Sequence, residues 1–332
     1  MSNTTGSTKV LKAIMIGCGD IAGGYDERHD SPDILSHAKA YREHPGFELV
    51  SCVEPDESRR REFQKIWNVQ TAFADLDDLL TDTIDFDVAS VCSPTPNHAE
   101  ILQRLQNSAV KGVFCEKPVT DSLSLTKKCI DLYEKSSIVL AVNYLRRWDK
   151  TLEDLKAEVD QGTWGALQNA VCHYGKGISH NGSHMIDLLQ FLFGPLKPMS
   201  VLQSQPGYGT VDPTLDARLT TQTGAPVYLI GNNARLFDLF ETSLTFEKGQ
   251  IILEQGTSVV RMRPIEENPR FKGHQTLLGG TNQDGDLGQA LYRAVDNFYR
   301  AITEGAPLAS DGRSALEAQN VCEQLMTMAL NT

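Results

Sequence analysis

The sequence predicts an α/β chain whose first half forms a doubly wound parallel sheet and whose second half forms an α+β domain. Short apolar runs alternate with amphipathic stretches as far as about residue 148, and a glycine-rich turn directly follows the first run. Beyond that point, strand-like segments follow one another without helices between them. Alternation is typical of a parallel sheet covered on both faces, whereas consecutive strands favour an antiparallel or mixed sheet.

Each element of the first half is predicted from its apolar periodicity. Buried strands are short continuous apolar runs, and helices show apolar residues at a spacing near 3.6. We expect strands at 12–16, 47–53, 88–92, 112–115 and 138–142, with helices at 32–43, 57–67, 75–80, 98–106 and 122–135. In such a sheet, ligands bind outside the carboxyl ends of the strands.

The second half begins with a predicted helix at 151–161. Strand-like segments follow at 167–173, 199–203, 217–223, 227–232, 243–247, 250–253 and 257–262, many of them separated by Gly or Pro turns. Helices are expected again at 287–304 and 314–330. Because 332 residues exceed most single hydrophobic cores, we expect two domains, 1–148 and 149–332.

The composition narrows the class of protein. With 40% hydrophobic and 22% charged residues the chain is globular, and its formal net charge of -12 argues against a nucleic-acid or anionic-membrane partner. Seven cysteines occur without a C-x-x-C pair, which favours a reducing compartment. Residues 1–10 lack the apolar segment of a signal peptide, and no apolar run reaches the ~18 residues of a membrane span. We therefore expect a soluble cytoplasmic protein.

A glycine fingerprint lies at the end of the first predicted strand. Gly17 gives the tight turn, Gly19 allows close approach of the backbone to a pyrophosphate, and Ala22 supplies the small third position. Together with the preceding strand, this pattern predicts a dinucleotide-binding turn formed by Gly17, Cys18, Gly19, Asp20, Ile21 and Ala22.

The second predicted strand ends in Glu54, where an acidic side chain would accept the adenosine ribose hydroxyls and repel a 2′-phosphate. This favours NAD over NADP, although the arginines at 59–61 could reverse the preference. The segment 23–35 resembles an insertion between the glycine turn and a helix beginning near Ser31-Pro32. Within it, residues 23–31 have little else to pack against, so we expect them to act as a lid on bound cofactor.

Glu116-Lys117-Pro118 follows the apolar run 113–115. A lone lysine at a strand end is usually only solvated. The glycine fingerprint, this Glu-Lys-Pro and the downstream His184, in this order, resemble the glucose-fructose oxidoreductase / inositol dehydrogenase / rhizopine catabolism (Gfo/Idh/MocA) family. The resemblance implies a Rossmann domain, a second domain on a large, mostly antiparallel open sheet, and NAD(P)-dependent hydride transfer at a secondary hydroxyl or ketone of a sugar, polyol or nucleotide-linked sugar.

The resemblance also implies roles for individual residues. Lys117 would hold the reacting oxygen, and His184 would accept its proton. His180 stands where the family carries an acidic residue, four positions before His184. Further cofactor contacts are expected from Ser93, Pro94, His98, Glu116 and Lys117. Substrate contacts are expected from Lys117, Asn143, Tyr144, Arg147, Lys176, His180, Asn181 and His184.

Several alternatives stay open. His180 and His184 share a helix face at i and i+4, so with Asp187 they could bind zinc, but the H-E-x-x-H glutamate is missing and we expect no metal. Both histidines could instead be structural, and Asp187 could be a cap or could orient a histidine. A non-catalytic nucleotide-sensing regulator on the same fold is the alternative function. The resemblance further implies a homodimer or homotetramer.

Overall fold

The computed structural model describes residues 9–27, 31–207, 212–277 and 279–330, which divide into two compact units. The first unit runs to Leu145 and includes Gly288–Leu316. The second consists of Arg146–Leu287 and the segment from Glu317 onward. The first boundary between the units lies after Leu145, three residues before the predicted one at 148. Residues 288–316 fall in the first unit, whereas they were predicted to lie in the second.

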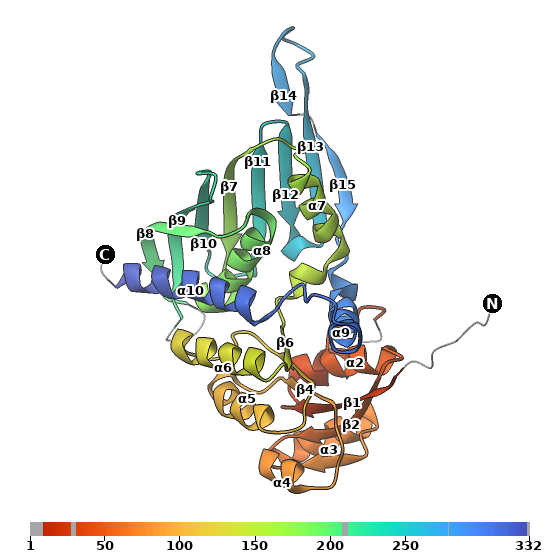
Figure 1. Ribbon diagram of the computed structural model, residues 1–332. Coiled ribbons are helices and arrows are strands. Elements are labelled where there is room, and N and C mark those ends of the chain that lie inside the picture. Colours follow the sequence, from red (N-terminus) through yellow and green to blue (C-terminus); the bar gives the residue numbers. More distant parts are fainter. Residues whose placement is uncertain (1–8, 28–30, 208–211, 278, 331–332) are drawn as a thin grey trace, which may run out of the picture. The chain divides into compact units, whose positions relative to one another are not determined.

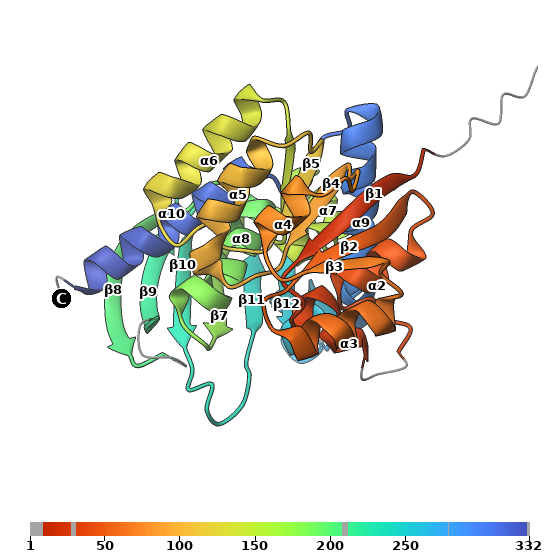
Figure 2. The same cartoon turned by 90° about the horizontal axis from the view of Figure 1, so that it is seen from below.

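The first unit contains a six-stranded parallel sheet with the order β3-β2-β1-β4-β5-β6 (Figures 1 and 2). This order reverses at β1, which is the arrangement of a doubly wound dinucleotide-binding fold. The predicted α/β class is confirmed. The strands are β1 (Leu11–Ile16), β2 (Phe47–Val53), β3 (Thr71–Phe73), β4 (Val88–Val91), β5 (Gly112–Cys115) and β6 (Val139–Val142).

Helices cover both faces of this sheet. The helices are α1 (Tyr25–Glu27), α2 (His37–Glu43), α3 (Glu57–Trp67), α4 (Leu76–Thr81), α5 (His98–Gln106), α6 (Leu123–Lys135) and α9 (Leu287–Glu304). On β5, the ring of Phe114 contacts His37 of α2 and Phe298 of α9, with centroids 4.6 and 5.8 Å apart. The next residue, Cys115, lies 3.7 Å from the ring of His98 on α5. Because successive strand residues face opposite sides, α2 and α9 lie on one face and α5 on the other.

The return of 288–316 to the first unit has a visible cause. Phe298 stacks on Phe47 of β2, and the segment after α9 extends the edge of the sheet, where Ser310 accepts a backbone hydrogen bond from Val142 at 3.2 Å. The side chain of Arg313 also forms ion pairs with Asp131 and Glu134 of α6. Local periodicity predicts these helices but not which core they join.

The second unit is built on a nine-stranded sheet with the order β14-β13-β12-β11-β7-β10-β9-β8, with β15 paired to β13. Among the described strands of this sheet, only β7 and β10 pair in parallel, so the sheet is mostly antiparallel, as expected. The strands are β7 (Leu167–Tyr174), β8 (Lys197–Gln205), β9 (Thr214–Thr220), β10 (Pro226–Gly231), β11 (Glu241–Phe246), β12 (Gly249–Glu254), β13 (Val259–Glu267), β14 (Gln275–Leu277) and β15 (Thr281–Asp284).

Two helices, α7 (Lys150–Asp160) and α8 (Ser183–Phe193), cover one face of this sheet (Figures 1 and 2). Phe193 of α8 meets Phe246 of β11 with ring centroids 6.1 Å apart. Strands β11 and β12 alternate strictly between buried and half-buried residues, which is the pattern of a sheet packed on one face. The final helix is α10 (Gly312–Ala329). Among the described residues, none of the helices has the length and apolar character needed to cross a membrane.

Candidate functional site

The turn after β1 is built on two glycines with different constraints. Gly17 has a φ of +87°, and a Cβ there would stand 2.7 Å from the backbone nitrogen of Ser93. Only glycine fits such a position. Gly19 has an ordinary φ of −79°, and a Cβ there would meet nothing within 4 Å. The space above Gly19 is therefore open to a ligand.

A helical turn begins directly after Gly19. Asp20–Gly24 forms one π-helical turn that continues into α1, and the backbone nitrogens of Gly23 and Gly24 bond to the Gly19 carbonyl at 3.1 and 3.3 Å. The predicted insertion therefore does not separate the glycine turn from a helix. It interrupts the helix instead, because α2 begins only at His37 rather than near Pro32. Backbone N–H groups at the start of the first turn can thus face an anion.

Glu54 is buried and already holds the glycine turn. Its carboxylate accepts hydrogen bonds from the backbone nitrogens of Cys18 at 3.0 Å and Asp56 at 3.1 Å. Arg59 lies 3.9 Å from the same carboxylate. Glu54 therefore has a structural function, which the sequence also allowed, in addition to the predicted contact with ribose hydroxyls. Each carboxylate oxygen can accept more than one hydrogen bond, so the two functions are compatible.

A cavity of about 350 Å³ opens at the carboxyl ends of β1, β2 and β4. Gly17, Glu54, Ser93 and Pro94 line it, all of which are predicted cofactor residues. Of the three arginines at 59–61, only Arg59 lines the cavity. The guanidinium of Arg60 instead donates to the carbonyl of Glu54, and that of Arg61 pairs with Glu57.

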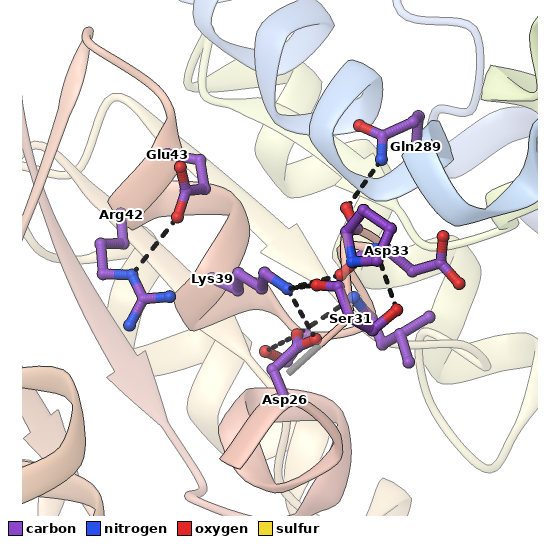
Figure 3. Close-up of polar contacts among 10 residues, drawn as sticks. Asp26, Ser31, Asp33, Lys39, Arg42, Glu43 and Gln289 are labelled. Atoms are coloured by element: carbon purple, nitrogen blue, oxygen red, sulfur yellow. Dashed lines mark hydrogen bonds and ion pairs between the residues drawn. The ribbon is translucent and has the colours of Figure 1, made fainter. Parts of the chain in front are cut away.

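The segment after α1 is anchored within the first unit. Lys39 of α2 donates to the carbonyls of Ser31 and Asp33 at 2.7 and 2.6 Å and lies 3.5 Å from Asp26 (Figure 3). Gln289 of α9 donates to the Pro32 carbonyl at 3.0 Å. The premise of the lid prediction, that this segment has little protein to pack against, is therefore wrong for the described part; residues 28–30 lie outside the described residues.

His98 is buried between two loops rather than directed into the cavity. Its ring nitrogens lie 2.8 Å from the carbonyl oxygen of Ser93 and 3.0 Å from that of Pro118. The ring of His98 therefore joins the loops after β4 and β5, and we do not propose it as a cofactor contact. The hydroxyl of Ser93, by contrast, is a buried group without a hydrogen-bond partner among the described residues.

Glu116 is held by one carboxylate oxygen. Oε1 accepts from His37 Nε2 at 3.1 Å and from Asn143 Nδ2 at 2.6 Å. Burial raises the pKa of Glu116, but the bond and charge of His37, the amide of Asn143 and the charge of Lys117 together hold it below its usual value. Lys117 follows at the same strand end and is half-buried. The Oδ1 atom of Asn143 is also buried without a partner in the described part of the chain.

Two predicted substrate residues after β6 have other surroundings. Tyr144 is buried, so we do not propose it as a substrate contact. In the second unit, Arg147 Nε donates to both oxygens of Asp187 at 2.9 and 3.0 Å. This pairing explains Asp187 better than the predicted cap or histidine orienter. Burial raises the pKa of Asp187 to about 7, although Arg147 opposes the shift.

His180 and His184 lie on consecutive elements, the π-helical turn Ile178–Gly182 and α8. Asp212 holds this turn by accepting from the backbone nitrogens of Ser179 and His180, both at 2.9 Å. His180 is exposed, with its Nδ1 atom 3.0 Å from Oδ1 of Asn181, whereas His184 is half-buried. Within the residues described above, no group of three or more His, Cys, Asp or Glu side chains is arranged to hold a metal ion.

A second cavity, of about 360 Å³, lies wholly within the second unit. The predicted substrate residues Lys176 and Asn181 line it, and Lys176 forms an ion pair there with Asp238. Sequence reasoning missed Arg146, whose guanidinium lies 3.9 Å from the ring centroid of Phe240. Burial lowers the pKa of Arg146 to about 10. The Arg146-Arg147 pair did signal a basic site, but not which of the two faces a cavity.

Comparison with known proteins identifies the first unit. Residues 11–144 match the family described as "Oxidoreductase family, NAD-binding Rossmann fold" (GFO_IDH_MocA). Over these residues the first unit matches the Gfo/Idh/MocA oxidoreductase family. The resemblance drawn from the glycine turn and Glu-Lys-Pro is thereby confirmed, and so is the dinucleotide-binding fold.

Relatives with assigned names agree with this match. The chain is 34% identical over 117 residues to myo-inositol 2-dehydrogenase of Thermotoga maritima, covering 35% of this chain and 34% of that protein. It is 26% identical over 266 residues to inositol 2-dehydrogenase of Rhizobium meliloti, covering 73% and 78%. Three of the curated relatives are matched over only 34%, 48% and 35% of their own length.

Solved structures share the fold of the whole chain. WlbA dehydrogenase of Bordetella pertussis, in complex with NADH and UDP-GlcNAcA, superimposes with a TM-score of 0.78 at 17% identity and covers 97% of each chain. An oxidoreductase of Agrobacterium radiobacter, in complex with NAD+, L-tartaric acid and magnesium, has a TM-score of 0.77 at 17% identity over 97% of this chain and 96% of that chain. The two-domain fold is therefore shared with these solved structures over almost the whole chain.

Proposed function

We propose that this Gfo/Idh/MocA protein is an NAD(P)-dependent dehydrogenase or reductase that acts on a secondary hydroxyl or ketone of a sugar, a polyol or a nucleotide-linked sugar. The observation that carries the proposal is the set of polar groups at the strand ends of the first unit. Ser93 Oγ and Asn143 Oδ1 are buried without partners in the described chain, and both lie in segments that directly follow sheet strands. Buried polar groups need partners, and a dinucleotide would supply them.

The remaining features fit the same cofactor. The open space above Gly19 admits a pyrophosphate, and the adjoining cavity contains Glu54. We propose NAD rather than NADP, because the Glu54 carboxylate would repel a 2′-phosphate. Arg59 at the cavity wall is the residue through which NADP could still bind. Known structures with this fold were solved with either cofactor, NADH in one case and NADP in another.

Lys117 and His184 are the proposed catalytic pair. A bound nicotinamide dinucleotide would supply or accept the hydride. Lys117 would donate a hydrogen bond to the reacting oxygen and stabilise negative charge on it, while the imidazole of His184 would take the hydroxyl proton. Lys117 belongs to the first unit and His184 to the second.

The second unit would supply substrate contacts. We propose that its cavity beside Lys176, Asn181 and Arg146 binds the part of the substrate remote from the reacting carbon. The UDP-sugar bound to WlbA dehydrogenase makes a nucleotide-linked sugar a candidate alongside inositol-like polyols. Arg147 is not proposed as an anion-binding residue, because Asp187 already occupies it. A cytoplasmic location and a homodimeric or homotetrameric assembly stay predictions.

The test is reduction of NAD+ and NADP+ with a panel of polyols, sugars and nucleotide-linked sugars, comparing wild type with Lys117→Met and His184→Ala. Each substitution should lower kcat by about 10²-fold or more while cofactor affinity changes little. Lys128→Met and His274→Ala, at exposed positions, are matched controls that should retain activity. Near-normal turnover by His184→Ala would refute the proton acceptor. Tight cofactor binding without turnover on any substrate would favour the nucleotide-sensing alternative.

A further inference from the structure

A buried chain of hydrogen bonds ends at the residue before the proposed catalytic lysine. The Tyr41 hydroxyl lies 2.8 Å from Ser90 Oγ, Ser90 Oγ lies 3.0 Å from His37 Nδ1, and His37 Nε2 lies 3.1 Å from Glu116 Oε1. Tyr41, Ser90 and His37 are all 0% exposed. The chain joins α2, β4 and the end of β5 within the first unit.

The chemistry of the partners gives this chain a direction. The ionised carboxylate of Glu116 can only accept, so His37 Nε2 must carry a proton. If His37 Nδ1 then accepts from Ser90, Ser90 accepts from Tyr41, and every proton of the chain is used. With a proton on Nδ1 instead, Ser90 would accept from His37. Either the Ser90 or the Tyr41 hydroxyl proton would then have no acceptor among the described residues, which is unfavourable.

The direction of these hydrogen bonds matters because it lets His37 donate to Glu116 and so fixes the orientation of the Glu116 carboxylate. His37 and Asn143 both donate to Glu116 Oε1, whereas no hydrogen bond from the described residues reaches Oε2. The side chain of Glu116 is 15% exposed, so part of it is open to a ligand. A carboxylate held by one oxygen from two directions cannot rotate freely, and its second oxygen becomes a fixed acceptor.

We propose that His37 is a positioning residue of the cofactor site: it fixes Glu116 through Oε1 and so directs Oε2 to a hydroxyl or amide group of the dinucleotide. The proposal rests on the proposed function for the identity of the ligand. His37 does not itself touch the cofactor. Ser90 and Tyr41 lie behind it and select the tautomer in which it can donate to Glu116.

Binding of NADH, followed by nucleotide fluorescence, tests this without turnover. His37→Leu removes the donor and should weaken NADH binding about tenfold or more, the effect of losing a charge-assisted hydrogen bond. His37→Gln places an amide N–H near the position of Nε2 and should restore most of the affinity. His44 at the end of α2 is the matched control: it is also buried, and its Nδ1 accepts from the backbone of Gly46 at 3.0 Å.

Thermal unfolding of the same samples separates positioning from packing. His44→Leu should lose stability yet bind NADH like wild type. Unchanged binding in folded His37→Leu, or an equal loss of affinity in His44→Leu, would overturn the proposal. If His37→Leu does not fold, ¹⁵N NMR of the wild-type imidazoles decides: a proton on Nε2 of His37 supports the chain, and a proton on Nδ1 alone overturns it. Wild type that binds neither NADH nor NADPH would instead sink the proposed function.

Discussion

Alanine at Gly17 and at Gly19 should have opposite consequences, although the two residues are only two positions apart. At Gly17 a Cβ would stand 2.7–2.8 Å from three backbone atoms of Cys92 and Ser93, and φ is +87°. The left-handed conformation alone costs about 1–2 kcal/mol for alanine, and the backbone of the loop after β4 must also move. We expect Gly17→Ala to lower the free energy of unfolding by about 3 kcal/mol or more.

Gly19→Ala should leave the fold intact, because φ is −79° and nothing lies within 4 Å of the added carbon. Its free energy of unfolding should change by less than about 1 kcal/mol. The methyl group would instead occupy the space proposed for the pyrophosphate, so NADH should bind about tenfold more weakly or worse. Urea denaturation and fluorescence titration measure the two quantities. Equal stability loss in both variants, or unchanged NADH affinity in Gly19→Ala, would refute the reasoning.

Three further outcomes follow from side chains of the site. The pKa of Asp187 is raised to about 7, so protonated Asp187 stabilises the fold below pH ~4, and this contribution is lost as the pH rises through about 7. In urea denaturation, the free energy of unfolding of Asp187→Asn should therefore depend less on pH over that range than that of wild type. Parallel curves for the two proteins would contradict this. Calorimetry should show that NADH binds more tightly than NADPH, and that Arg59→Ala weakens the binding of NADPH further. Tighter binding of NADPH would show that Glu54 does not determine the cofactor preference. His180→Asp, which restores the family's residue type, should keep substantial activity in steady-state assays, and complete inactivity would show that His180 has a chemical function.

Most elements of the first unit could be predicted because each carries its own signal. The strands at 47–53 and 112–115 and the helices at 57–67 and 98–106 have the predicted bounds. Strand β3 was missed because Thr71–Phe73 is three half-buried residues without an apolar run. Strand β15 was missed because its four residues are polar and exposed, so pairing with β13 alone makes them a strand.

The site could be predicted where the backbone conformation requires one residue type. It could not be predicted where the function of a side chain depends on which distant residue it contacts. Gly17 requires glycine whatever surrounds it, so its turn can be read from the sequence. Arg146 and Arg147 are adjacent and chemically identical, yet one stacks on Phe240 and the other binds Asp187. Such a division depends on residues distant in the chain, which local patterns do not contain.

Glu54 has a consequence for protein engineering. Replacing the acidic residue after the second strand is the obvious route to a dinucleotide dehydrogenase that accepts NADP. Here Glu54 also accepts hydrogen bonds from the backbone nitrogens of Cys18 and Asp56. A neutral substitute would therefore destabilise the glycine turn at which the cofactor is proposed to bind. Conversion of cofactor preference in this scaffold should therefore begin with the cavity wall around Arg59 and leave Glu54 in place.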